Sequence, residues 1–212
     1  MKSKWPELRP GDIFAVKGEG FLAWLNRKLI QPETDRYHFG LIGDYVPWED
    51  DYVILESIGK GIAVGRISFY KNKDVKIYRI NEPDDLVDYY GKHATTEVSR
   101  LGRGKYDYFL YVKITLGVLK VWLRQLSFWQ RPTTIEFWEI PYATNSSFVC
   151  TEAAAEGYKR AGYMLLLPNE CPVPSAFQEQ FELGRIVEVA HWQSGLVIMS
   201  IGFSSLTIQG VV

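Results

Sequence analysis

Short segments with the composition of β-strands follow one another in the first part of this chain, and they constrain its fold more than any other feature. Each is rich in β-branched and aromatic residues, which favour strands. They occupy residues 13–16, 36–45, 52–58, 62–67 and 75–80, mostly with tight connections between them. Strands joined by tight turns pair antiparallel, because a parallel pair needs a long crossover. We therefore expect an antiparallel sheet.

Helical patterns are placed around these strands. Apolar residues recur at helical spacing, or cap signals enclose a helical segment, over residues 21–30, 83–100, 108–129 and 148–161. Pro83 suits the first turn of the second helix, and Gly162 is expected just after the last one. Two late strands are predicted over 185–192 and 196–201. The sequence thus predicts an α+β fold.

Composition limits the classes of partner. The 212 residues suit one domain, and 47% hydrophobic and 23% charged residues are typical of a globular protein. The formal net charge of −1 gives no basic excess for binding nucleic acid. The polar, proline-containing start does not resemble a signal peptide, so we expect a cytoplasmic protein, or one released by lysis or by a viral route.

The segment 108–129 is apolar and includes Trp122 and Trp129. Lys113, Lys120 and Arg124 interrupt the run of about 20 apolar residues that a membrane span needs. We therefore expect no membrane span. A core helix is the interpretation we favour here; an amphipathic helix resting on a membrane surface is the alternative.

Several cofactor motifs are absent or incomplete. Residues 18–23 match the dinucleotide pattern G-x-G-x-x-A, but consecutive strands follow them instead of alternating strands and helices. The chain has no phosphate-binding loop, no G-x-S-x-G, no C-x-x-C and no H-E-x-x-H. We expect neither a metal nor an organic cofactor.

Of the two cysteines, Cys150 has the more reactive setting. A lone cysteine is usually a small buried hydrophobe. Cys150, however, falls in the first turn of a predicted helix, where unpaired N–H groups and partial positive charge favour the thiolate. The same N–H groups could stabilise an oxyanion, although Glu152 opposes the thiolate somewhat. Cys171 lies in a proline-containing loop and is interpreted as structural.

Among the three histidines, His38 stands in an otherwise apolar strand. His93 lies in a polar helix and His191 on a late strand, so we interpret them as solvated and structural. A hairpin centred on Pro47 would place His38 directly opposite Glu56, with Cβ atoms about 4.5–5.5 Å apart. A carboxylate in that position would orient the imidazole and leave its other nitrogen as a base.

Four segments together resemble a known family. Residues 8–14, 38–42, 54–57 and 148–152 read LRPGDIF, HFGLI, ILES and FVCTE, and residues 167–177 resemble the family's closing segment. In this order they resemble the circularly permuted branch of the NlpC-type papain-like cysteine peptidases, distant kin of the lecithin:retinol acyltransferases. The resemblance implies an antiparallel sheet packed against helices, with the His strand before the Cys helix.

By position, the resemblance assigns the nucleophile to Cys150, the base to His38 and the orienting group to Glu56. It implies a catalytic domain over 1–182, with a helical, aromatic insertion at about 108–140, and a C-terminal strand extension over 183–212 packed on the same domain. The aromatic segment is larger than the family's pattern requires, and the strands after residue 182 depart from it. These departures leave the substrate and the state of assembly open.

Three functions remain after this reading. The first is a hydrolase that cleaves amide bonds of peptides or cell-wall peptides, with a peptide or acyl-amide substrate. The second is a lipid-directed acyltransferase or thioesterase that uses the same three residues. The third is a non-catalytic structural or assembly protein whose apolar C-terminal strands would form the interface of an oligomer.

Overall fold

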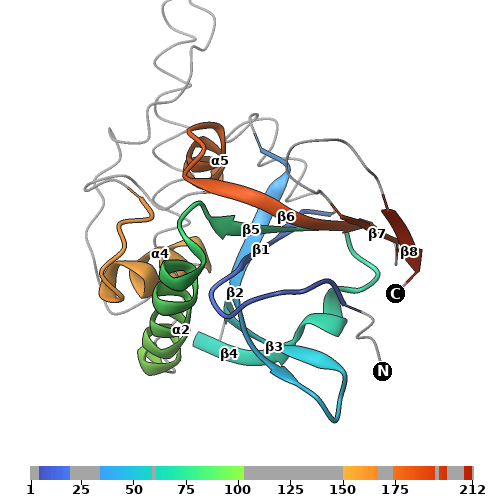
Figure 1. Cartoon of the computed structure of the whole chain (residues 1–212), viewed down its shortest axis with the longest axis horizontal. Helices are drawn as coiled ribbons and strands as arrows, with labels where there is room; N and C mark the ends of the chain where they lie inside the picture. Colours follow the sequence, from blue (N-terminus) through green and yellow to red (C-terminus); the bar gives the residue numbers. More distant parts are fainter. Residues whose placement is uncertain are drawn as a thin grey trace, which may run out of the picture.

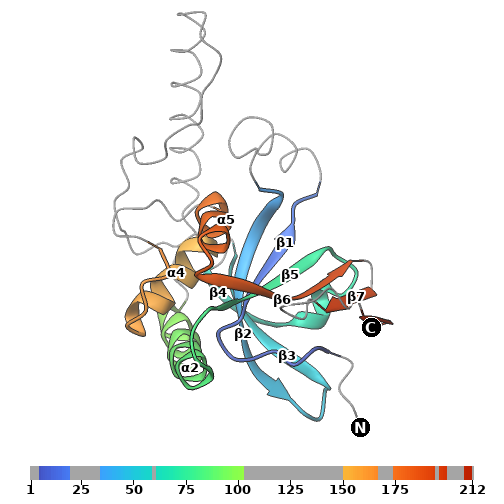
Figure 2. The same cartoon turned by 45° about the horizontal axis from the view of Figure 1, so that its top comes forward.

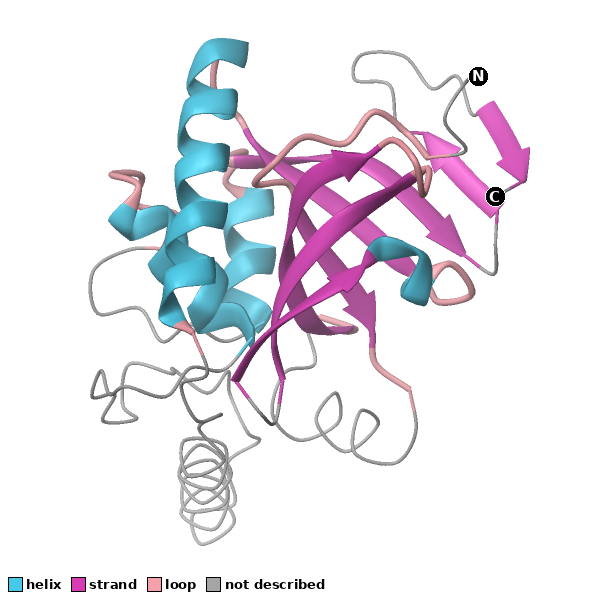
Figure 3. Ribbon diagram, turned by 90° about the horizontal axis from the view of Figure 1, so that it is seen from below, coloured by secondary structure: helices cyan, strands magenta, loops and turns pink. Residues whose placement is uncertain are grey.

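The computed structural model describes residues 5–19, 34–58, 61–102, 150–166, 174–193, 196–199 and 208–211. One twisted sheet dominates them, with strands in the order β4-β3-β2-β1-β5-β6-β7-β8 and every neighbouring pair antiparallel (Figures 1 and 3). The strands are β1 Ile13–Lys17, β2 Arg36–Val46, β3 Asp51–Ile58, β4 Gly61–Arg66, β5 Val75–Ile80, β6 Ile186–Gln193, β7 Leu196–Met199 and β8 Ile208–Val211.

The described helices lie together at one side of this sheet, as two views agree (Figures 1 and 2). They are α2 Asp84–Leu101, α4 Cys150–Arg160 and α5 Pro174–Glu182, and a 3-10 turn, η1 Ile67–Tyr70, follows β4. None of the helices in these ranges has the length and apolar character that crossing a bilayer requires. The α+β class with an antiparallel sheet is therefore confirmed.

Two hydrophobic clusters cover the two faces of the sheet. Alternate strand residues such as Ala15 and Leu41 pack against the helices, where Val98 and Tyr158 are fully buried. The residues between them, such as Phe14, pack on the opposite face with Ile67 of η1 and Trp192 of β6. This alternation follows from the two-residue period of a strand, with both faces covered by apolar side chains.

The expected strands agree closely with the observed ones. The bounds of β5 are those predicted. The predicted bounds are correct to within one residue for β1, β2, β3 and β6, and for the first residue of β7. Strand β4 ends one residue early, because Ile67 begins η1. The short helix α5 and the strand β8 were not predicted. The predicted helices over 21–30 and 108–129, the insertion at 108–140, and Cys171 lie outside the described residues.

Helix α4 is held at both of its flanks. A Cβ atom at Gly157 would lie 2.9 Å from the carbonyl oxygen of Ala94, so α4 and α2 approach more closely than a larger residue would allow. The buried Tyr158 hydroxyl donates to the carbonyl oxygen of Gly11, 2.7 Å away. Gly162 ends the helical segment with φ of 91°, as expected for its predicted place. These contacts fix the direction in which α4 presents its first residue.

A buried ion pair ties the turn before β1 to β5. Arg79 donates from Nε and Nη2 to the two carboxylate oxygens of Asp12, each at 2.7 Å. The Asp12 side chain is 1% exposed and that of Arg79 16% exposed. The Arg9 backbone N–H also donates to Asp12, at 2.8 Å. A two-pronged pair of this kind fixes geometry as well as charge.

Candidate active site

Cys150 and His38 meet where α4 begins beside the start of β2. Cys150 is the first residue of α4 and is 6% exposed, and its thiol is free. The Cys150 thiol donates to the carbonyl oxygen of Tyr37, with 3.8 Å between sulfur and oxygen, and the sulfur lies near enough to the imidazole of His38 to raise the pKa of His38. Two residues that are 112 positions apart in the chain thus lie close enough to interact.

Glu56 completes the group from the next strand. Its Oε2 contacts Nε2 of His38 in a short hydrogen-bonded ion pair. Since Nε2 is engaged there, Nδ1 is the ring nitrogen available to the sulfur of Cys150. The side chain of Glu56 is only 10% exposed and that of His38 29% exposed. The structure therefore brings together all three residues that the sequence singled out.

The predicted register of the hairpin is wrong by two residues. Gly40, not His38, lies directly opposite Glu56, and Leu41 pairs with Leu55. The turn is centred beyond Pro47, which offsets the pairs nearest the turn by three residues, and an irregularity between Ile42 and Tyr45 reduces this offset to two at Glu56. A shift of two residues keeps a side chain on the same face, so His38 and Glu56 meet as diagonal neighbours.

Gly40 makes this diagonal contact possible. A Cβ atom there would lie 2.6 Å from the carbonyl oxygen of Leu55 and closer still to the ring of Phe14. The Phe14 ring occupies the space over Gly40 and stands edge-on to His38, with 6.0 Å between ring centroids. Glycine at this position thus lets Phe14 support the imidazole from the side.

The surroundings stabilise charge on both partners. Burial by itself lowers the pKa of His38, but hydrogen bonds with Cys150 and Glu56, and their negative charges, outweigh it and raise the pKa to about 10. Burial raises the pKa of Glu56, but hydrogen bonds from His38 and Tyr70, with the charge of His38, lower it overall. The imidazolium and the carboxylate are therefore the favoured forms at neutral pH.

Tyr70 is a member of the group that sequence reasoning missed. Its hydroxyl donates to the same Oε2 of Glu56, at 2.7 Å. Its ring lies 6.0 Å from that of His38 and 5.5 Å from that of Phe14, between centroids. The only signal in the sequence was an aromatic residue just after a predicted strand. The sequence does not show where such a side chain points, because the direction is set by η1, which folds back over the sheet.

The N-terminus of α4 suits an acyl-transfer reaction. Backbone N–H groups in the first turn of a helix have no partner within the helix, and the helix dipole adds positive charge there. A carbonyl oxygen that gains negative charge beside Cys150 would meet this end of α4. Glu152, the acidic residue of the first turn, is buried.

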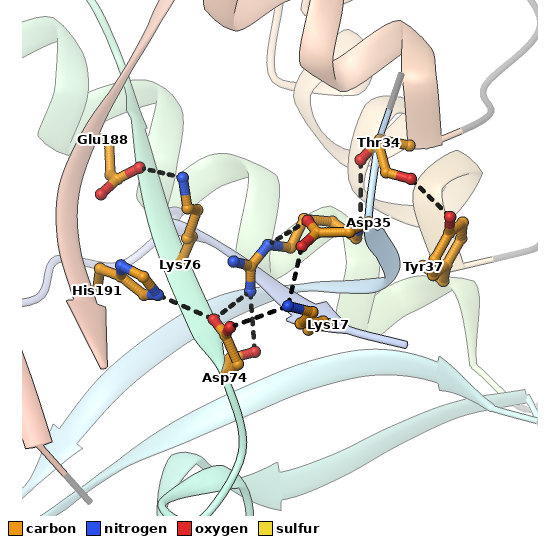
Figure 4. Close-up of polar contacts among 9 residues, drawn as sticks. Lys17, Thr34, Asp35, Tyr37, Asp74, Lys76, Glu188 and His191 are labelled. Carbon is orange, nitrogen blue, oxygen red and sulfur yellow. Dashed lines mark hydrogen bonds and ion pairs between the residues drawn. The ribbon is translucent and has the colours of Figure 1, made fainter. Parts of the chain in front are cut away.

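The other histidines lie apart from this group. His93 is exposed, and its Nδ1–H donates to the carbonyl oxygen of Tyr89, 2.7 Å away. His191 is paired through Nε2 with Asp74, 2.8 Å away, in a charged network across β1, β2, β5 and β6 (Figure 4). Asp74 also accepts from Arg36 at 2.7 Å. This geometry agrees with the solvated and structural roles expected for His93 and His191.

Within the described part of the chain, no group of three or more His, Cys, Asp and Glu side chains is arranged to hold a metal ion. Comparison of the sequence with protein-family models and with curated proteins finds no match.

Proposed function

We propose that this protein is a cysteine-dependent hydrolase that cleaves amide bonds of peptides or cell-wall peptides. One observation carries the proposal. Cys150, at the first residue of a helix, lies beside His38 with its thiol on the carbonyl oxygen of the preceding Tyr37, and Nε2 of His38 contacts the buried carboxylate of Glu56. A nucleophile, a base and a group that orients the base are the minimum set for covalent acyl transfer.

The first half of the reaction forms a thioester. The thiolate sulfur of Cys150 attacks the carbonyl carbon, and the N–H groups at the start of α4 stabilise the oxyanion. The C–N bond then breaks, and the imidazolium of His38 gives its Nδ1 proton to the departing amine nitrogen. Glu56 keeps the imidazole in the tautomer and orientation that this transfer requires.

The second half restores the enzyme. His38 takes a proton from water, and the resulting hydroxide attacks the thioester carbon. The C–S bond breaks and the sulfur leaves as the thiolate, while His38 is again the imidazolium. Replacing water by another acceptor would give acyl transfer through the same thioester.

The permuted papain-like arrangement is part of this proposal. It is supported by the order of the elements, since the strand with His38 and the strand with Glu56 precede the helix that begins at Cys150. It is also supported by the antiparallel sheet packed against α2, α4 and α5. What this chain has in common with the permuted arrangement is the order of the three functional side chains along the sequence. Such side chains act through their geometry and not through their sequence positions.

Trapping of the thioester tests the proposal. The full chain is incubated with a library of peptide amides and with an activated acyl ester, and is then quenched in acid and measured by intact mass. The proposal predicts an acyl adduct on Cys150 and release of free amine, both lost in Cys150→Ala and strongly reduced in His38→Ala. His93→Ala is the matched control, because His93 is exposed on α2, and it should behave as the wild type. An adduct that persists in Cys150→Ala would contradict the proposal.

A further inference from the structure

Two hydrogen-bond donors converge on a single oxygen of Glu56. His38 Nε2 contacts Oε2, and the hydroxyl of Tyr70 donates to the same oxygen at 2.7 Å. The Glu56 side chain is 10% exposed, so water can replace neither donor easily. A buried carboxylate needs such donors to stay ionised, because desolvation favours its neutral form.

The backbone of Tyr70 is held independently of Glu56. The indole Nε1 of Trp192 donates to the carbonyl oxygen of Tyr70 at 3.2 Å, and the Lys73 N–H donates to the same carbonyl at 2.9 Å. Trp192 is fully buried on β6 and packs against Trp5 in a tilted arrangement, with 5.6 Å between ring centroids. Ile67, at the other end of η1, is also fully buried. The position of Tyr70 is therefore fixed by contacts other than its hydrogen bond to Glu56.

The hydroxyl of Tyr70 remains a hydrogen-bond donor at every pH at which His38 or Glu56 changes charge. Burial, then its bond to Glu56 and the negative charges of Glu56 and Cys150, raise the pKa of Tyr70 far above its ordinary value. Its hydroxyl proton is thus retained where His38 and Glu56 change charge. The ring also rests against Phe14 and His38, so the hydroxyl cannot turn away freely.

From this geometry we propose that Tyr70 is a positioning residue, which keeps Glu56 ionised and aims its Oε2 at Nε2 of His38. The inference rests on the proposed function, since it assigns Tyr70 to the machinery of the same site. It also gives β6 a part in the site, because Trp192 holds the carbonyl of the residue that holds Glu56. Tyr70 does not itself touch the reacting atoms.

Tyr70→Phe tests this inference, because it removes the hydroxyl and keeps the ring packed against Phe14. Without that donor the pKa of Glu56 should rise, because one of the hydrogen bonds that stabilise its carboxylate is lost. The readout is the carboxyl signal of Glu56 in ¹³C-glutamate-labelled protein, assigned by its absence in Glu56→Gln. The rate of Cys150 alkylation by iodoacetamide is measured against pH as the second readout. The pH at which this rate falls on the acid side of the profile should rise by the same amount.

Two controls separate positioning from a general effect on the fold. Tyr45→Phe removes another hydroxyl bonded to a carboxylate, that of Asp50 at 2.7 Å, and should leave both readouts unchanged. In a Glu56→Gln background, Tyr70→Phe should cause no further shift of the alkylation profile. A merely structural role would instead lower the stability of both backgrounds equally, without moving the Glu56 titration.

The outcomes distinguish this inference from the proposed function. An unmoved Glu56 titration in Tyr70→Phe, beside fast alkylation that depends on His38 in the wild type, overturns the inference alone. Slow alkylation that is independent of His38 overturns the proposed function. If the pKa of Glu56 nevertheless rises in Tyr70→Phe, Tyr70 keeps Glu56 ionised without serving catalysis. A moved titration together with a moved acid limb supports both.

Discussion

Gly40 lies directly opposite Glu56 in the pairing of β2 with β3, and the space above it is filled by the ring of Phe14. The Glu56 side chain therefore meets no neighbour straight across the pair and reaches diagonally to His38. The contact between base and carboxylate depends on a position that has no side chain of its own.

Gly40→Ala should consequently damage both stability and the site. The new methyl group would press on the carbonyl oxygen of Leu55 and on the Phe14 ring, neither of which can move without disturbing the sheet. We expect a loss of about 1–3 kcal/mol in the free energy of unfolding and at least a tenfold fall in Cys150 alkylation. Urea unfolding and alkylation kinetics measure the two effects.

Gly43→Ala is the matched control in the same strand. Its Cβ would lie 3.2 Å from the side chain of Val53, a contact that a small adjustment relieves. An alkylation rate in Gly40→Ala equal to that in Gly43→Ala would show that Phe14 and the diagonal contact do not support His38.

Glu56→Gln should remove the charge that holds His38 as imidazolium. The pKa of His38 would fall toward its usual range, because burial then acts against the charged form with less compensation. We expect alkylation of Cys150 at pH 7 to slow by about tenfold, the factor that corresponds to a change of one unit in a pKa. Glu49→Gln, which alters an exposed carboxylate paired with Arg66, should change nothing.

The stability of the protein should depend on pH through both members of this pair. The folded-state pKa of His38 is raised to about 10, so its contribution is fully present below about 6.5 and is lost as pH rises toward 10. The pKa of Glu56 is lowered, so its contribution is present above about 4.5 and is lost as the pH falls below that value. Stability measured in urea should thus decline on both sides of the interval from about 4.5 to 6.5.

His38→Ala isolates the alkaline part of that dependence. The slope of unfolding free energy against pH between about 6.5 and 10 should become shallower in this variant. An unchanged slope would mean that His38 binds its proton equally well in the folded and unfolded chains.

Asp12→Ala should be among the most destabilising single changes in the described part of the chain. It leaves the guanidinium of Arg79 largely buried without its two-pronged partner. We expect a loss of about 3–5 kcal/mol in unfolding free energy. Glu49→Ala, which breaks an exposed ion pair with Arg66, should shift the melting temperature little by comparison. Equal losses in the two variants would contradict the structural role given to Asp12.

Local sequence patterns predicted most of the strands and the two longest described helices. Runs of β-formers mark β1, β2, β3 and β5, and apolar spacing with a following glycine marks the helix that begins at Cys150. The short helix α5 has little more than two turns, so its helical period is hard to distinguish from that of a loop.

The details of the site depend on contacts that the sequence does not display. The register of β2 and β3 was mispredicted because the turn is centred between Trp48 and Glu49 and not at Pro47. The irregularity between Ile42 and Tyr45 then changes the pairing by one residue, and no residue type indicates either feature. Tyr70 reaches Glu56 only because η1 folds back over the sheet and Trp192 anchors it. His38, Glu56 and Cys150 could be chosen because their residue types have few other reasons to occupy an apolar strand or the start of a helix.

The rate of Cys150 alkylation as a function of pH, in the wild type and in His38→Ala, tests most directly whether His38 activates Cys150. Fast reaction of the wild type is expected at pH 7, because His38 as imidazolium stabilises the thiolate. In His38→Ala the rate at pH 7 should fall at least tenfold, because the sulfur then has no imidazole beside it to take its proton. Equal, slow reaction of both proteins at pH 7 would contradict the central claim that Cys150 and His38 form a nucleophile and its base.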